Sequence, residues 1–107
     1  MQVLIVEFGI VGMSSEELEA GATDLASAFA EIPGCIEKTW LTDPSSNTYG
    51  GVYKFRDRAA LDAYLSSELF DGVKSNPAFT DVTARTFSVM ERPTEITHGS
   101  PRAAAAP

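Results

Sequence analysis

The sequence predicts a single α+β domain in which two amphipathic helices cover one face of a four-stranded antiparallel sheet. The chain has 107 residues, a length that suits one domain. Hydrophobic residues make up 44% and charged residues 21%, which is typical of globular proteins. Strand-like and helix-like segments follow one another in the order β-α-β-β-α-β. We expect this domain to span residues 1–92, followed by a tail at residues 93–107 whose end is flexible.

The first half of the chain contains a strand and a helix. Residues 2–11 form an almost unbroken β-rich run with apolar residues at both parities, which predicts a strand buried on both faces. A helix begins after Ser14, because Ser14 and Glu17 have the spacing of a capping box. It ends at Pro33-Gly34. One apolar stripe follows from the spacing of Leu18, Ala22, Leu25, Phe29 and Ile32.

The second half contains three strands and one helix. We assign the strands to residues 35–42, 49–55 and 80–90, and the helix to residues 57–69. Residues 43–47 are rich in turn formers, so the first two of these strands form a hairpin. Asp57 caps the helix, and residues 72–77 break it. This order of elements is the ferredoxin-like arrangement.

Charge and composition exclude several functions. The net charge of −7 and the pI near 4.5 disfavour binding to nucleic acid or to an anionic membrane. We find neither a membrane-spanning run nor a signal peptide, and therefore expect a cytoplasmic protein. Cys35 is the one cysteine and His98 the one histidine, so disulfides and two-histidine metal sites cannot form within one chain. We expect no metal and no other cofactor.

The hairpin register predicts which side chains share a face. If Thr42 pairs with Tyr49, then Trp40 opposes Gly51, a residue that leaves room for the indole. In the same register Lys38 opposes Tyr53, and Ile36 opposes Phe55. A slip by one residue would instead bring Lys38 beside Lys54 of the next strand, so that two like charges would lie close together. We therefore prefer the first register.

This register gathers an aromatic surface with one cation. Trp40, Tyr53 and Phe55, with Tyr49 as a weaker candidate, are the residues that we expect to bind a planar apolar substrate. The alternative is that these rings simply fill the core or an interface. Tyr64 belongs to the apolar stripe of the second helix, which favours the core.

Three ionisable residues lie within the predicted strands. Glu7, Lys38 and Arg85 need partners if they are buried, and one interpretation is that they form structural ion pairs. In the catalytic interpretation, Lys38 or Arg85 stabilises the negative charge of a phenolate or enolate. His98 is a candidate general base if the tail folds over a pocket, although a solvated histidine is the simpler interpretation.

Several segments resemble the YdhR-like mono-oxygenase family. Residues 33–40 resemble its P-G-x-x-x-K-x-W segment, and residues 50–55 its G-G-x-Y-x-F strand. Residues 63–65 and 87–89 are similar to its second helix and last strand. The resemblance runs from about Val3 to His98. Glu37 replaces an apolar or aromatic residue of the family pattern, and the alanine-rich extension is additional.

The resemblance implies a dimeric α/β-barrel fold and a mono-oxygenase that uses no prosthetic group on an aromatic or polyketide-like small molecule. The sheet leads separately to a homodimer, because helices cover one face only and a second copy can bury the other. Two alternatives stay open. One is an isomerase or cyclase on the same fold, and the other is a non-catalytic dimer that binds a small molecule.

Overall fold

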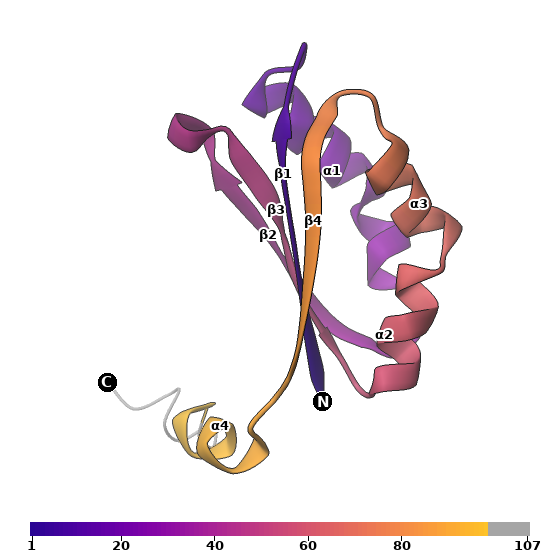
Figure 1. The fold of residues 1–107 in the computed structure, drawn as a ribbon, viewed down its shortest axis with the longest axis vertical. Coiled ribbons are helices and arrows are strands. Elements are labelled where there is room, and N and C mark those ends of the chain that lie inside the picture. Colours follow the sequence, from indigo (N-terminus) through magenta and orange to yellow (C-terminus); the bar gives the residue numbers. More distant parts are fainter. Residues whose placement is uncertain (99–107) are drawn as a thin grey trace.

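The computed structural model describes residues 1–98 and has the predicted α+β, ferredoxin-like architecture (Figure 1). Four antiparallel strands form one sheet in the order β2-β3-β1-β4. The strands are β1 (Gln2–Ile10), β2 (Cys35–Asp43), β3 (Thr48–Phe55) and β4 (Phe79–Ser88). The helices are α1 (Ser15–Ala30), α2 (Arg58–Leu65), α3 (Glu68–Ser75) and α4 (Glu91–His98), and a short 3-10 turn η1 (Pro44–Ser46) joins β2 to β3.

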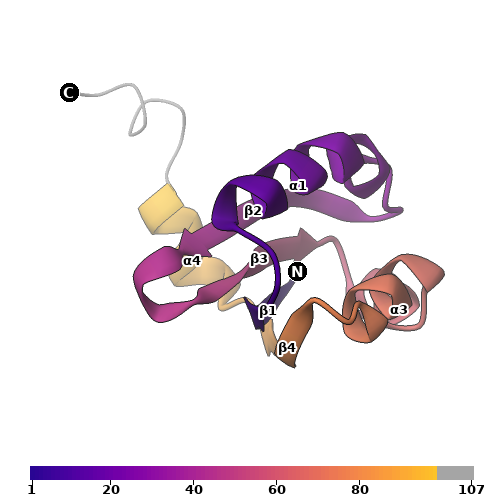
Figure 2. The ribbon, with the colours of Figure 1, turned by 90° about the horizontal axis from the view of Figure 1, so that it is seen from above.

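Helices cover one face of the sheet. Figures 1 and 2 show α1, α2 and α3 on the same side of the four strands, while α4 lies beyond the end of β4 and away from them. Leu4 and Val6 of β1 point to the helices and are buried. Val3 and Ile5, which alternate with them, point to the uncovered face and are half-buried. Within the single chain, then, one face of β1 is enclosed and the other is not.

The start of α1 confirms the predicted capping box. The Ser14 hydroxyl accepts a hydrogen bond from the Glu17 backbone N–H at 3.1 Å, and the Glu17 carboxylate accepts one from the Ser14 N–H at 2.8 Å. These bonds satisfy two donors that the first turn leaves free. The chain therefore enters α1 at a fixed point directly after β1.

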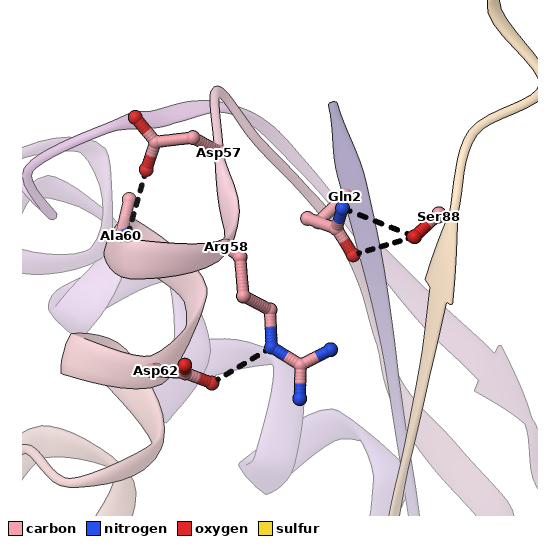
Figure 3. Close-up of polar contacts among 6 residues, drawn as sticks. All are labelled: Gln2, Asp57, Arg58, Ala60, Asp62 and Ser88. Carbon is pink, nitrogen blue, oxygen red and sulfur yellow. Dashed lines mark hydrogen bonds and ion pairs between the residues drawn. The ribbon is translucent and has the colours of Figure 1, made fainter.

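The second predicted helix is in fact two helices, so the single helix over residues 57–69 is wrong. Asp57 caps α2 through the Ala60 N–H at 2.9 Å, as predicted, and Arg58 pairs with Asp62 (Figure 3). The helix stops at Ser66 because Ser67 starts a new one: its hydroxyl accepts from the Phe70 N–H at 3.2 Å. The predicted breaker Gly72 lies inside α3.

The tail begins with a helix that the sequence did not predict. The N–H of Val89 donates to the carbonyl of Met1 at 3.0 Å, and the amino group of Met1 lies 2.9 Å from the Glu91 carboxylate. Nearby, the Gln2 side chain bonds Ser88 across β1 and β4 (Figure 3). These contacts connect the start of α4 to the start of β1. The expected flexible end of the tail lies outside the described residues.

The hairpin register is confirmed along most of its length. Lys38 pairs with Tyr53, Trp40 with Gly51, and Thr42 with Tyr49. The predicted pairing of Ile36 with Phe55 is wrong, because a bulge between Cys35 and Glu37 inserts an extra residue and brings Cys35 opposite Phe55. The bulge leaves Ile36 exposed and directs Cys35 against the core.

The core is concentrated where α2 and α3 meet the sheet. Its buried members are Leu4, Val6, Phe29, Ile32, Tyr53, Phe55, Leu61, Tyr64 and Phe70. Aromatic rings supply much of this volume, and four of them pack in contact: Tyr53, Phe55, Tyr64 and Phe70. Among the residues that the structure describes, no helix is long and apolar enough to cross a membrane.

Candidate functional site

A cavity of about 570 Å³ lies between the sheet and helices α1 and α3. Its roof is the part of the predicted apolar stripe that lies within α1, where Phe29 is buried while Leu25 is about half exposed. Strands β1, β2 and β3 form the floor, and Val73 and Phe79 close the side near α3. The stripe therefore faces a hollow instead of a filled core, and the hollow is largely apolar, as small-molecule sites are.

Two glycines of β3, Gly50 and Gly51, lie at the floor of the cavity. A side chain at Gly50 would collide with the backbone carbonyl of Val6 on the neighbouring strand. A Cβ at Gly51 would lie only 2.8 Å from Cε of Lys38, which lies across this position. The lack of a side chain at Gly51 thus lets Lys38 of β2 lie over this position, with its end inside the cavity.

The end of Lys38 is surrounded by aromatic rings. Its Nζ lies 3.5 Å from the ring centroid of Phe29, 3.4 Å from that of Trp40 and 4.5 Å from that of Tyr53. Phe29 and Trp40 meet edge to face at 5.0 Å, so the amine sits in the corner between them. Within residues 1–98 no carboxylate comes within 4 Å of it. Burial lowers the pKa of Lys38 to about 7.

A hydrogen-bonded tyrosine pair lies beneath this corner. The hydroxyls of Tyr53 and Tyr64 are 2.9 Å apart and buried. Burial raises the pKa of both, that of Tyr64 to about 12. Burial also raises the pKa of the Cys35 thiol, an effect that the nearby Lys38 partly offsets. These three groups are neutral at physiological pH. Among these four neighbouring groups, Lys38 is therefore the one whose charge changes near neutral pH.

The structure places three of the four predicted substrate-binding residues at the cavity and the fourth in the core. Trp40, Tyr49 and Tyr53 line the cavity together with Lys38. Phe55 shares their face of the sheet but is fully buried against Leu4 and Tyr64 and does not reach the cavity. Its place in the core follows from its position at the end of β3, beneath α2.

The other predicted catalytic residues lie elsewhere. Arg85 projects from the uncovered face, where its guanidinium is 5.1 Å from the ring of Phe87. His98 is the last residue of α4 and is not part of the cavity lining. In the described part of a single chain, Glu7, Lys38 and Arg85 form no ion pair, so pairing of these residues across the sheet of one copy is not found. The cation that pairs across the sheet is Lys54, 3.1 Å from Glu37.

The sequence did not identify three rings of the cavity. Phe29 was assigned only to the helical stripe and Phe8 only to a strand, while Phe79 fell just before the predicted last strand. Phe8 and Phe79 stack at 4.1 Å and close the far end of the cavity. Their signal lies in the parity of β1: Phe8 follows Leu4 and Val6 at steps of two and therefore points to the helices.

Solved structures define the class of fold to which this domain belongs. A putative antibiotic biosynthesis monooxygenase from Deinococcus radiodurans superposes with a TM-score of 0.68 at 16% identity, covering 85% of this chain and 94% of its own. SnoaB, a cofactor-independent oxygenase from Streptomyces nogalater, gives 0.66 at 20% identity, covering 84% and 93%. The heme-degrader MhuD from Mycobacterium tuberculosis gives 0.68 at 20%, covering 84% and 96%. The fold is thus that of the antibiotic biosynthesis monooxygenases.

The sequence itself places the chain more narrowly. Residues 3–100 match the profile of the family described as "Putative mono-oxygenase ydhR". The chain belongs to this family. No curated protein sequence matches the chain significantly.

The one histidine of the chain is outside the lining, so no imidazole of the same chain faces the cavity. In the described residues, no group of three His, Cys, Asp or Glu side chains could hold a metal ion. The lining is instead suited to an apolar organic molecule next to one amine.

Proposed function

We propose that the protein is a mono-oxygenase that oxidises an aromatic or polyketide-like small molecule with O₂ in the cavity beneath α1. The observation that carries the proposal is the position of Lys38, an amine without a carboxylate partner in the corner between two aromatic rings. An acidic carbon or phenol that lies in this cavity has one group beside it that can take its proton. Family membership supports the same class of reaction.

The reaction needs no added reductant, because the substrate supplies the electrons. The Lys38 amine takes a proton from a methylene group that is flanked by aromatic rings and a carbonyl, and the ammonium then stabilises the enolate. The enolate passes one electron to O₂, and the resulting substrate radical and superoxide combine to a peroxide anion. This anion takes the proton back from the Lys38 ammonium and becomes a hydroperoxide. Loss of water leaves a new carbonyl group. One oxygen atom ends in the product and the other in water.

The remaining side chains position the substrate. Trp40 offers a partly exposed ring at the edge of the cavity, against which a planar ligand can stack. Tyr53 contributes ring surface to the floor, since its hydroxyl is already bonded to Tyr64. Tyr49 is buried and lines the cavity farther along β3. A low pKa of Lys38 suits its role, because a base works best near the operating pH.

Oxygen uptake tests the proposal. The protein is incubated with a panel of anthrones and phenols, and an active substrate is turned over under ¹⁸O₂. We expect one labelled atom in the product and a rate that falls at least about 100-fold in Lys38→Met, the range of general-base catalysis. Lys54→Met is the matched control, because Lys54 lies on the paired strand but is bonded to Glu37 on the other face.

The same experiment separates the alternatives. A product of unchanged mass with a rearranged skeleton would assign the cavity to an isomerase or cyclase. Saturable binding of panel compounds without turnover, weakened in Trp40→Ala, would make it a binding protein. Turnover that survives in Lys38→Met would remove the proposed base.

We also propose that two copies pair through the uncovered face of the sheet. Val3, Ile5 and Val52 form an apolar patch at its centre, and Phe87 extends it on β4. A patch of this kind is typical of an interface, and C2 dimers are the commonest assembly. Light scattering should give the mass of a dimer, and Val52→Glu that of a monomer, with Ala63→Glu on the exposed side of α2 as control. A wild-type monomer would contradict the proposal.

A further inference from the structure

We propose that Lys38 is a carbonyl-reactive amine, whose Nζ forms an imine with a neutral aromatic aldehyde or ketone that occupies the cavity. This activity is distinct from oxygenation. It needs no O₂, and it would stand if the mono-oxygenase reaction failed.

The amines of the chain differ in whether a carboxylate lies next to them. The chain has three lysines. Lys54 lies 3.1 Å from Glu37, Lys74 lies 3.4 Å from Asp71, and the amino terminus lies 2.9 Å from Glu91. A carboxylate partner favours the ammonium form, which has no lone pair and cannot attack a carbonyl. Among these four amines of the described residues, Lys38 is the one with no such partner.

Among the elements that the structure describes, none around Lys38 places a carboxylate next to the amine. The side chains that do lie next to it are neutral. Its own strand brings Cys35, and β3 brings Tyr53 and Tyr49, which are buried. Helix α1 presents Phe29 to the amine and places Glu17 and Glu19 elsewhere on the lining, beyond 4 Å from Nζ. The pKa of about 7 that follows from burial leaves much of the amine unprotonated at neutral pH.

The lining also indicates the class of carbonyl compound. Most of its surface is apolar or aromatic, which favours a ring-bearing ligand over a small polar aldehyde. Glu17 and Glu19 lie on the same lining, and the whole chain has a net charge of −7. An anionic aldehyde or keto acid would be repelled on approach. A neutral aromatic aldehyde or ketone suits the apolar lining and is not repelled by the negative charge.

The reaction balances without an oxidant or reductant. The Nζ lone pair adds to the carbonyl carbon while the carbonyl oxygen takes up a proton and the nitrogen loses one. The carbinolamine hydroxyl then leaves as water, and a carbon–nitrogen double bond forms. The protonated imine carries its charge where the ammonium did, between the faces of Phe29 and Trp40, which stabilise a cation.

Reductive trapping under argon tests the inference with the full chain. Benzaldehyde is the probe, cyanoborohydride reduces any imine to a stable benzyl amine, and peptide mass spectrometry locates the added group. We expect Lys38 to react at least about ten times faster than Lys54 and Lys74, which serve as controls in the same molecule. Equal modification of the three lysines, or modification of the amino terminus alone, would overturn the inference.

Two variants and a pH series make the test specific. Lys38→Arg keeps the charge but abolishes trapping at this position. Gly51→Ala keeps the lysine but places a methyl group only 2.8 Å from its Cε, so the lysine must shift and we expect trapping at Lys38 to slow several-fold. In the native protein, the trapping rate at Lys38 should reach half its maximum near pH 7. A midpoint near pH 10, the value of a solvated lysine, would contradict the inference.

Discussion

The helix-covered face of the sheet is filled at one end and hollow at the other. At the filled end, Leu4, Tyr53 and Phe55 pack beneath α2 against Leu61 and Tyr64, each no more than 2% exposed. At the hollow end, the same strands β1 and β3 continue beneath α1, but the space above them is a cavity of about 570 Å³. One sheet thus carries a packed core and an apolar cavity a few residues apart.

The difference arises from side-chain size on both layers. Below α2, β3 contributes Tyr53 and Phe55, whose rings fill the gap to the helix. Beneath α1, β3 contributes Gly50 and Gly51 with no side chain, and the inner side of α1 includes the small Ala22 and Ala26. The larger side chains at this end, among them Trp40 and Tyr49, line the cavity without filling it. Stability and ligand binding are therefore expected to respond to different substitutions.

The largest effect is expected at the filled end. Leu61→Ala removes a fully buried side chain from the centre of the core and should lower the free energy of unfolding by about 2–5 kcal/mol. Leu25→Ala is the matched change at the hollow end, where the side chain is already about half exposed, and should cost under about 1 kcal/mol. Urea denaturation of both variants measures the contrast. Similar losses in the two would mean that the cavity is a packed core in solution.

Lys38→Met tests the electrostatics of the hollow end. The pKa of Lys38 is about 7 in the folded chain and near 10.4 in the unfolded chain. Between these values the unfolded state binds more protons, so the native protein gains stability as the pH rises from 7 to 10. Below pH 7 the lysine has its full destabilising effect. Lys38→Met should therefore be more stable than wild type at pH 6, by about 1–2 kcal/mol, because the ring faces offset part of the burial.

The comparison across pH makes this prediction specific. The advantage of Lys38→Met should shrink as the pH rises from 7 to 10, as measured by thermal unfolding in each buffer. Trp40 is the one tryptophan and lies 3.4 Å from the amine, so its fluorescence should titrate near pH 7 in wild type and not in the variant. A pH-independent difference in stability would show that Lys38 stays protonated throughout.

Signals that are local in the sequence predicted much of the fold. The capping box of Ser14 and Glu17 and the hairpin register through Trp40 and Gly51 are confirmed, because each depends on residues that are near in sequence or directly opposed. The break at Ser66-Ser67 was missed, since the apolar spacing continues across it. Helix α4 was missed because Pro93 suggested a tail, although proline is tolerated in the first turn, where its N–H would have no partner.

The hollow end was less predictable, because a cavity depends on the distance between layers. The register placed Lys38 with Trp40 and Tyr53 on one face, and this grouping is confirmed. Nothing in the sequence brings Phe29 of α1 over the same amine, because that contact depends on how the helix crosses the sheet. The stripe that contains Leu25 and Phe29 was predicted from its spacing alone, and periodicity cannot distinguish a filled core from a lined cavity.

A smaller effect on stability is expected at Trp40. Its ring is 41% exposed, so Trp40→Ala should cost only about 1 kcal/mol, mainly through the lost contact with Phe29. The effect on a stacked aromatic ligand should be larger, about tenfold or more in affinity by isothermal titration. Trp40→Phe is the control and should retain most of the affinity. A large loss of stability with unchanged affinity would move Trp40 from the site to the core.

The smallest effect is expected on the uncovered face, where Lys54 has the carboxylate partner that Lys38 lacks. Lys54 pairs with the exposed Glu37 at 3.1 Å, and exposed ion pairs contribute from zero to about 1 kcal/mol. Glu37→Gln should therefore change the free energy of unfolding by less than about 1 kcal/mol, and the change should vanish in 1 M salt. If the proposed dimer buries this pair, the loss will be larger and will persist in salt, because a charge would be left unpaired inside the interface. Urea denaturation at low and high salt thus tests whether the second face of the sheet is open to water.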